Sequence, residues 1–322
     1  MSTLTPAFVS GLGEEKLLQL RSSELWRTVY CDYCYLPLSE KYYSEYHGGK
    51  YSDHSFVLYN KNEPVLYFPC NLNNNRLSWF EFPISIFCTI KDPLILTEIY
   101  KLLESFLEKL VREKSVSELF VYFNEYLTRS FFTKIAEVKS HHHTMIDLQI
   151  PEENIKANIR KSNKTLVNWG QRELVLKITD HSNPDRELFN EFHDFHIRTA
   201  GRKTRSDESW NTQYEMVLQG QAFFVSAYYK DKIASNLLIL HGLEEAYYGV
   251  AVNDRELMEK NEPITHYPLL ASVYHAKKIG LKKFNFNEVD KKGDAKMDSI
   301  SNFKLGYSNW LELKTSYIFK FN

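Results

Sequence analysis

The chain lacks an excess of charge of either sign. Its 322 residues include 40 lysines and arginines against 41 aspartates and glutamates, giving a formal net charge of −1. Proteins that bind nucleic acid through its phosphates usually carry a basic excess, because counterion release supplies much of their affinity. The balance therefore disfavours bulk nucleic acid as a partner, while a local basic cleft for a phosphorylated small molecule stays open.

Segments typical of disorder, export or membrane insertion are also missing. The chain has only 12 glycines and 10 prolines, and no tract of low complexity. No apolar run approaches the roughly 18 residues of a membrane-spanning helix, and the N-terminal residues do not form a basic stretch followed by an apolar one. With 43% hydrophobic residues, we expect two packed cores in a cytoplasmic monomer or homodimer with no membrane partner.

The cysteines and histidines do not have the spacing of a metal site. The cysteines are Cys31, Cys34, Cys70 and Cys88. The first two form a CxxC pair inside an aromatic stretch, and no second pair follows at zinc-site spacing, so we expect structural thiols. The run His141–His143 alternates between strand faces, and His193 and His196 have no third ligand nearby, so we expect no metal. Serine-hydrolase, P-loop and Rossmann motifs do not occur.

A weak internal repeat is the most informative pattern present. In each half, two strands joined by a polar turn precede a third strand, an amphipathic helix, a fourth strand, a short helix and a closing strand. The first copy is predicted at 54–69, 76–84, 94–113, 117–123, 126–136 and 144–150. The second copy is predicted at 222–240, 245–253, 264–279, 282–289, 301–307 and 313–321. Gly280 is expected to end the first helix of the second copy.

A basic connector at 151–171, expected to be helical, separates the two copies. The second copy is preceded by a strand at 174–180 and by two helices that end at about Gln219. Helices packed on a mixed, mainly antiparallel sheet define an α+β (α/β) lobe. The sequence thus predicts an N-terminal lobe at 1–150 and a C-terminal lobe at 172–322.

Two short segments, Ile159–Lys164 and Ser301–Tyr307, read as a basic helix and as a Phe-Lys-x-Gly-aromatic sequence. They are similar to segments of the FemAB-like peptidoglycan-bridge ligases and related acyltransferases, whose tandem-GNAT layout the doubled arrangement resembles. The resemblance implies two GNAT-like lobes, of which the first is degenerate. The chain departs from ordinary GNAT proteins in lacking a glycine-rich phosphate loop after its third strand, and in having Asn302 where a tyrosine often stands.

The resemblance implies a CoA-dependent N-acyltransferase. The chain has no long helical arm of the kind found in some tRNA-dependent ligases, and together with the balanced charge this favours acyl-CoA as the donor. The branch that it looks most like acylates nucleotide-linked amino sugars, such as dTDP-3-amino-3,6-dideoxyhexoses, in glycan biosynthesis. An aminoacyl-tRNA-dependent peptidyltransferase of the FemAB type and a non-catalytic nucleotide-sugar-binding module are the alternatives.

In a GNAT-like lobe the third strand diverges from the fourth, and the resemblance places the acyl donor there. Backbone N–H groups that stabilise the oxyanion are expected at Gly249, Val250 and Ala251. Tyr248 beside them contacts the acyl group or simply fills the sheet surface. The next helix begins near Thr265 and His266, where exposed N–H groups favour the coenzyme's pyrophosphate, unless both residues only cap the helix. Asn302 is a further candidate for coenzyme contact.

Acyl transfer from an activated thioester needs positioning, an oxyanion donor and a route for one proton. Lys304 is the first candidate for catalysis by resemblance, although it could be a solvent-facing lysine. Asn285, Asn287 and Glu288 close the fourth strand, where asparagine is unusual. One of them is expected to contact pantetheine or to take the amine's proton, and His241 is a candidate base.

Cations suited to the acceptor's diphosphate occur in two places. They are Arg202, Lys203 and Arg205 in the loop after 199, and Arg160 and Lys161 in the connector. A guanidinium group binds phosphate oxygens through two parallel hydrogen bonds. The alternative is that both clusters are solvated faces.

Overall fold

The computed structural model describes residues 4–122, 124, 131, 133–289 and 293–321. Contacts within the chain group it into two compact units. The first comprises Met1–Tyr30, His47–Ser140 and Lys314–Asn322, and the second comprises Cys31–Tyr46 and His141–Leu313. This grouping differs from the lobes predicted at 1–150 and 172–322, because each unit takes in a segment from the far half of the chain. Within the described residues, no helix is long and apolar enough to cross a membrane.

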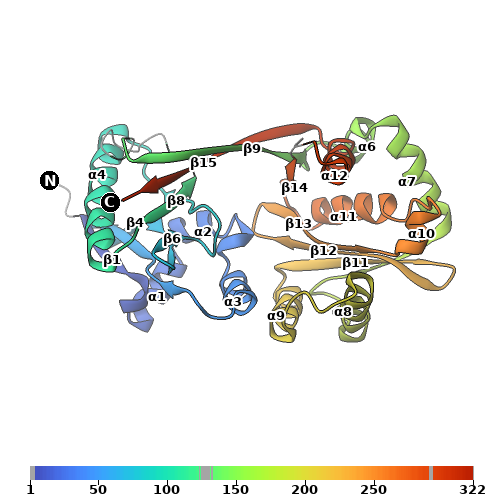
Figure 1. The fold of residues 1–322 in the computed structure, drawn as a ribbon, viewed down its shortest axis with the longest axis horizontal. Coiled ribbons are helices and arrows are strands. Elements are labelled where there is room, and N and C mark those ends of the chain that lie inside the picture. The colour runs from blue at the N-terminus through green and yellow to red at the C-terminus, as the bar shows by residue number, and fades with distance from the viewer. Residues whose placement is uncertain (1–3, 123, 125–130, 132, 290–292, 322) are drawn as a thin grey trace. The chain divides into compact units, whose positions relative to one another are not determined.

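The second unit is built on a sheet whose strands follow the order β10, β11, β12, β13, β14 and β9 (Figure 1). These strands are Leu174–Thr179, Ala222–Tyr229, Lys232–His241, Glu245–Asn253, Lys283–Val289 and the end of Ile135–Asp147. Neighbours run antiparallel, except that β13 and β14 are parallel. The turn between β11 and β12 places Lys230 and Asp231 at positive φ, which matches the twist of a tight hairpin.

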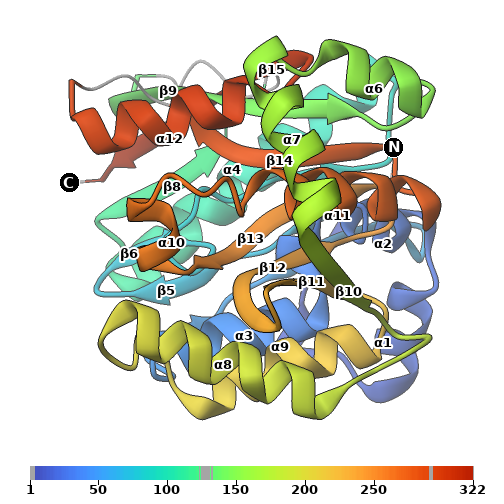
Figure 2. The same cartoon turned by 90° about the vertical axis from the view of Figure 1, so that its right-hand side faces the viewer.

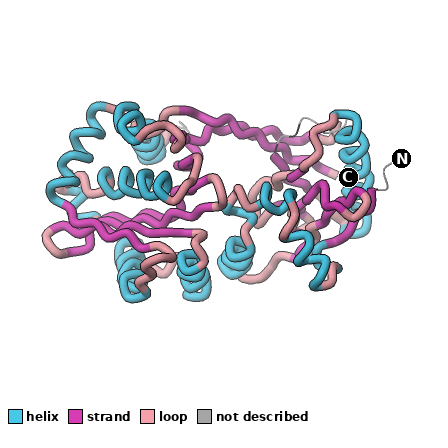
Figure 3. Tube along the Cα trace, turned by 180° about the vertical axis from the view of Figure 1, so that it is seen from behind, coloured by secondary structure: helices cyan, strands magenta, loops and turns pink. Residues whose placement is uncertain are grey.

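Helices cover both faces of this sheet (Figures 1 and 3). On one face α11 (His266–Lys278) packs on β11 and β12, and α7 (Lys161–Glu173) packs on α11. On the other face lie α8 (Arg186–Ala200) and α9 (Asp207–Leu218). The unit also contains α6, α10 and α12, which are Glu152–Asn158, Arg255–Glu259 and Ala295–Leu305. Its main core joins apolar residues of the sheet to those of α11.

The N-terminal segment of the second unit docks on α9. It contains the 3₁₀-helix η2 (Tyr33–Tyr35) and α3 (Pro37–Tyr46). Thr212 donates a hydrogen bond to the Glu45 carboxylate at 2.6 Å, and Lys41 pairs with Glu215 at 2.7 Å. These polar contacts hold a segment from the start of the chain in the second unit.

The first unit has two groups of paired strands. The first group is β1 (Leu4–Phe8), β3 (Phe56–Asn60), β4 (Glu63–Phe68) and β7 (Phe87–Cys88). The second group is the end of β15 (Trp310–Lys320), β8 (Glu118–Tyr122), β6 (Arg76–Ser78), β5 (Asn71–Asn73) and β2 (Ser52–Asp53). Its longer helices are α1 (Glu14–Arg21), α2 (Glu24–Val29) and α4 (Pro93–Lys114).

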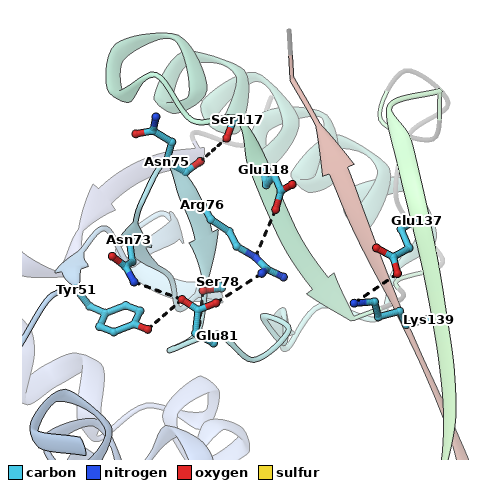
Figure 4. A network of polar contacts seen from close by, with 10 residues as sticks. All are labelled: Tyr51, Asn73, Asn75, Arg76, Ser78, Glu81, Ser117, Glu118, Glu137 and Lys139. Atoms are coloured by element: carbon cyan, nitrogen blue, oxygen red, sulfur yellow. Dashed lines mark hydrogen bonds and ion pairs between the residues drawn. The ribbon is translucent and has the colours of Figure 1, made fainter. Parts of the chain in front are cut away.

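A polar network in the first unit surrounds the point where one predicted strand ends early. Arg76 on β6 lies 3.5 Å from the Glu81 carboxylate and 3.8 Å from that of Glu118 (Figure 4). The chain reaches Glu81 by turning back after Ser78, with Phe80 and Glu81 at positive φ. The predicted strand at 76–84 is therefore wrong beyond Ser78, because a tight turn rather than alternation follows.

Most elements of the second copy are confirmed, and with them the α+β class. The predicted strand at 245–253 is β13, and Gly280 follows α11 at a φ of 90° as expected of a helix end. The helix predicted at 301–307 is α12, which begins earlier, at Ala295, because Asp294 caps it. The helix predicted at 126–136 falls largely outside the described residues, and its last two positions, Ile135 and Ala136, begin β9 instead.

Candidate functional site

The parallel pairing of β13 and β14 stops partway along both strands. Cα partners run only from Glu245 to Tyr247 on β13, while β13 continues to Asn253 and β14 to Val289 (Figure 2). No further partners join these two fully described strands, so the expected divergence is confirmed. We call this place the strand divergence. Beyond it, the edge of β13 lies outside the ladder and can pair with an extended ligand.

A bulge in β13 lies just beyond the last paired residues. Gly249 is the extra residue where Leu238 and Ile239 of β12 pair with its two neighbours. A Cβ at this position would lie 3.2 Å from the Leu238 carbonyl oxygen, so glycine suits the close approach. Gly249 and Ala251 are exposed, with Val250 buried between them. The candidate oxyanion donors thus occupy a bent strand edge, and bulges commonly redirect backbone groups at functional sites.

One face of the strand divergence is aromatic. The rings of Tyr248 and Phe286 lie 6.1 Å apart, and those of Phe286 and Tyr307 lie 6.3 Å apart. His266, the first residue of α11, has Nδ1 2.6 Å from the Tyr307 hydroxyl. Burial lowers the pKa of His266 to about 4 and raises the pKa of Tyr307 well above its usual range. Both groups are therefore neutral at pH 7 and share a hydrogen bond between the Tyr307 hydroxyl and the imidazole.

The other face is polar, because successive strand residues alternate between faces. Asn285 is buried, and its Nδ2 donates to the Glu245 carboxylate at 2.7 Å and lies 3.3 Å from His143 Nδ1. Asn287 donates from Nδ2 to the Tyr247 hydroxyl oxygen at 2.5 Å. Each asparagine of β14 is thus tied to a side chain of β13.

Tyr247 is supported in turn by the N-terminal segment. Its ring stacks on that of Tyr33 with centroids 4.5 Å apart and planes at 27°. The pKa values of Tyr33, Tyr43 and Tyr247 are raised mainly by burial, so these hydroxyls stay protonated at neutral pH. Aromatic packing against Tyr33 therefore supports the polar face of the strand divergence.

Lys304 lies beside the end of β14. It projects from α12, and its Nζ donates to the Glu288 carbonyl oxygen at 2.8 Å. Burial lowers the pKa of Lys304, and the Glu288 charge acts in the opposite direction. The Glu288 carboxylate itself is on an exposed residue. The structure thus brings together three predicted catalytic residues, namely Lys304, Glu288 and, next to it, Asn287.

The two segments that carry the family resemblance meet in space. The Arg160 backbone N–H, at the start of α7, donates to the Gly306 carbonyl oxygen at 2.8 Å. A Cβ on Gly306 would lie 2.2 Å from Nδ2 of the buried Asn163, so a larger residue there would displace the Asn163 amide. The side chains of Arg160 and Lys161 are exposed near this junction.

His241 lies on β12 opposite Ala246, one of the residues of β13 that still pair with β14. His241 packs against the ring of Phe223, and Phe223 also contacts His275, which pairs with Asp180 at 3.0 Å. His275 is close to the C-terminal end of α11, whereas Tyr307 contacts His266 at its N-terminal end. Among the described residues, no group of three or more histidine, cysteine, aspartate or glutamate side chains could hold a metal ion.

Two further residues were predicted to contact the coenzyme. Thr265 precedes α11 without capping it through its side chain. Asn302 is exposed on α12.

The loop cations differ in their surroundings. Lys203 is already paired with Asp207 at 2.7 Å, and Arg202 is exposed. Arg205 donates to the Tyr42 hydroxyl at 3.1 Å and lies over the Trp210 ring at 5.1 Å. No carboxylate of the described chain lies within ion-pair distance of Arg205, whose buried Nε has no hydrogen-bond partner there. Arg205 is thus the loop cation best placed to meet an anion.

Sequence reasoning missed two contributors to this site. Tyr307 was only the last residue of the segment Ser301–Tyr307, and its hydrogen bond to His266 is visible only in the fold. Tyr33 comes from the other end of the chain, and no local pattern links it to Tyr247.

No protein-family model matches the chain, and no curated protein matches it in sequence. Among solved structures, FemX superposes with a TM-score of 0.67 at 9% identity, covering 99% of this chain and 98% of that one. A tandem GNAT protein from the clavulanic acid biosynthesis pathway superposes with a TM-score of 0.53 at 11% identity, covering 98% of both chains. For the C-terminal domain of a putative lysylphosphatidylglycerol synthetase from Agrobacterium fabrum, the TM-score is 0.57 at 9% identity, covering 87% of this chain and 91% of that one. The chain therefore adopts the tandem GNAT fold.

Proposed function

We propose that the protein is a CoA-dependent N-acyltransferase that acylates the amine of a nucleotide-linked amino sugar, such as a dTDP-3-amino-3,6-dideoxyhexose. The observation that carries the proposal is the strand divergence, where the pairing of β13 and β14 ends. Lys304 and the Tyr307–His266 pair lie next to it. The likeness to tandem GNAT structures supports acyl transfer as the reaction class.

The donor is proposed to lie along the free edge of β13. A pantetheine arm is extended and carries two amides, so it can continue the ladder that β14 leaves. The bulge at Gly249 exposes the backbone, and an N–H group of Gly249, Val250 or Ala251 would donate to the thioester oxygen. The N-terminus of α11, next to Thr265, is proposed to favour the pyrophosphate through the helix dipole.

The transfer is proposed to be direct. The amine nitrogen attacks the thioester carbon, the C–N bond forms and the C–S bond breaks, while one proton leaves the nitrogen and one reaches the thiolate. Lys304 would stabilise the oxyanion, and the exposed Glu288 carboxylate would accept the amine's proton. Tyr307 keeps its proton at neutral pH and is the candidate donor to the thiolate.

The acceptor's diphosphate is proposed to bind at Arg205. Its buried Nε lacks a partner among the described residues, and a buried donor without a partner costs about 1–3 kcal/mol unless a ligand satisfies it. Arg202 and Lys203 would contribute long-range attraction, as would Arg160 and Lys161 if the nucleotide reaches them.

Aminoacyl transfer from tRNA is the second candidate. The observation that favours it is the superposition on FemX over nearly the whole of both chains. The two candidates share the strand divergence and Lys304 and differ in the donor.

A thiol-release assay separates these candidates. The purified protein is incubated with acetyl-CoA or longer acyl-CoA and a panel of dTDP- and UDP-linked amino sugars, and free thiol is followed with a chromogenic disulfide. Turnover that needs both substrates and survives RNase supports the CoA proposal. Absence of thiol release with every pair contradicts it, and RNase-sensitive transfer from charged tRNA supports the second candidate.

A further inference from the structure

We propose that Asn287 and Tyr247 act together as a side-chain clamp that sets how far β14 departs from β13, which makes them positioning residues. The structural half of this inference stands on the contacts in the ligand-free protein. Its functional half, control of donor affinity, rests on the proposed function.

Asn287 sits in a bulge on the opposite edge of β14 from the strand divergence. Asn285 pairs with Met145 of β9 and Glu288 pairs with His143, so two residues of β14 face Thr144 alone. Asn287 adopts a left-handed conformation with a φ of 72°. A non-glycine residue in this conformation persists only where its surroundings hold it, although asparagine tolerates it better than most.

The side-chain amide of Asn287 is engaged at both its nitrogen and its oxygen. Its Nδ2 donates to the Tyr247 hydroxyl oxygen at 2.5 Å, and its Oδ1 accepts from the Glu288 backbone N–H at 2.7 Å. Its own N–H donates to Asn285 Oδ1 at 2.7 Å, and its carbonyl oxygen accepts from the Thr144 hydroxyl at 3.4 Å. An amide engaged at both ends holds the backbone of Asn287 and Glu288 in place.

The contact crosses the strands where backbone pairing has already ended. The last backbone partners are Tyr247 and Asn285, and the Glu245–Asn285 hydrogen bond joins the same strands one step earlier. The Tyr247–Asn287 hydrogen bond is therefore the next rung, made by side chains in place of the ladder. It limits the separation of the two strands while leaving β13 beyond Tyr247 without a partner on β14.

The clamp also reaches Lys304. Asn287 fixes the Glu288 N–H, and the Glu288 carbonyl oxygen accepts the Lys304 ammonium at 2.8 Å. On the other side, Tyr247 is held by its stack on Tyr33. A single chain of contacts thus runs from the N-terminal segment through the strand divergence to the candidate catalytic cation.

The test uses two variants and two matched controls. Asn287→Gly keeps the left-handed backbone accessible but removes the amide, and Tyr247→Phe removes only the hydroxyl. Asn62→Gly makes the same change at another left-handed asparagine, in the first unit. Tyr228→Phe removes another hydroxyl, which bonds Glu191. Binding of CoA is measured by calorimetry well below each unfolding temperature, and hydrogen–deuterium exchange is measured over residues 284–289 without ligand.

We expect each clamp variant to bind CoA roughly tenfold more weakly, which corresponds to about 1.4 kcal/mol. The double variant should be little weaker than either single one, because both remove the same contact. Exchange at 286–289 should be faster in both clamp variants, and the controls should match the wild type in both measurements.

The outcomes separate the clamp from the proposed function. Unchanged exchange in both clamp variants overturns the clamp, whatever CoA does. Faster exchange with unchanged CoA affinity overturns the positioning role, because a merely structural contact would behave that way. If the wild type does not bind CoA, the proposed function fails, and the exchange data still decide whether the clamp exists.

Discussion

The contact between α7 and α11 is so close that adding one methyl group should weaken the second unit. Gly170 is buried on α7, and a Cβ there would lie 2.5 Å from Tyr267 Cβ and 3.4 Å from Leu174 Cδ1. Carbon atoms in contact are normally about 3.5–4.0 Å apart, so the Gly170→Ala substitution must push the helices apart by about 1 Å. Tyr267 cannot yield easily, because its Cβ is anchored to the backbone.

The magnitude follows from two opposing terms. Overpacking costs about 1–3 kcal/mol, and alanine gains about 1 kcal/mol over glycine in a helix interior. We therefore expect Gly170→Ala to lose about 1 kcal/mol, whereas the same change in an uncrowded helix would gain that amount. The control is Asn168→Ala, at an exposed site on the same helix, which reports helix propensity without the clash.

Chemical denaturation of the whole protein, monitored by circular dichroism, measures both variants. The expected order of stability is Asn168→Ala at or above the wild type, and Gly170→Ala below it. A stabilised Gly170→Ala variant would refute the close packing of α7 on α11.

Three further predictions concern the candidate site. Replacing Lys304 with methionine should lower kcat about 100- to 1000-fold if the cation stabilises the oxyanion, as measured by thiol release. An effect confined to KM would show that Lys304 does not take part in catalysis. Arg205→Met should raise KM for the nucleotide sugar about 10- to 100-fold. Lys203→Met should change this KM little, because the Lys203 amine is already paired with Asp207. Equal effects of the two substitutions would contradict the assignment of the diphosphate to Arg205. Burial lowers the pKa of His266 to about 4 from 6.5, so its contribution to stability is complete above about pH 6.5 and is lost as the pH falls towards 4. His266→Gln should therefore flatten the dependence of the unfolding free energy on pH by up to one proton in that window, and an unchanged slope in urea unfolding would contradict its burial.

The elements of the second unit were accessible from local patterns. Alternation and turn residues marked β11, β12 and β13, and the bounds of β13 at Glu245–Asn253 match the predicted strand. Such signals are strong because each depends on a few neighbouring residues. The unusual asparagines of β14 also pointed to a site, and the structure puts Asn285 and Asn287 at the strand divergence.

Non-local contacts account for what the sequence could not reveal. The conformation of Asn287 depends on a bulge opposite Thr144, which is distant in the chain. Tyr33 reaches Tyr247 only because residues 31–46 pack with the second unit. His241 drew interest through its place beside a turn, but its surroundings are Phe223 and the nearby His275.

A crystal structure of the protein with bound CoA tests the central claim most directly. The account predicts that the pantetheine arm extends along β13 at Gly249–Ala251, with its thiol towards Lys304 and its pyrophosphate at the start of α11. CoA bound on another element, with the β13 edge left unpaired, would contradict it.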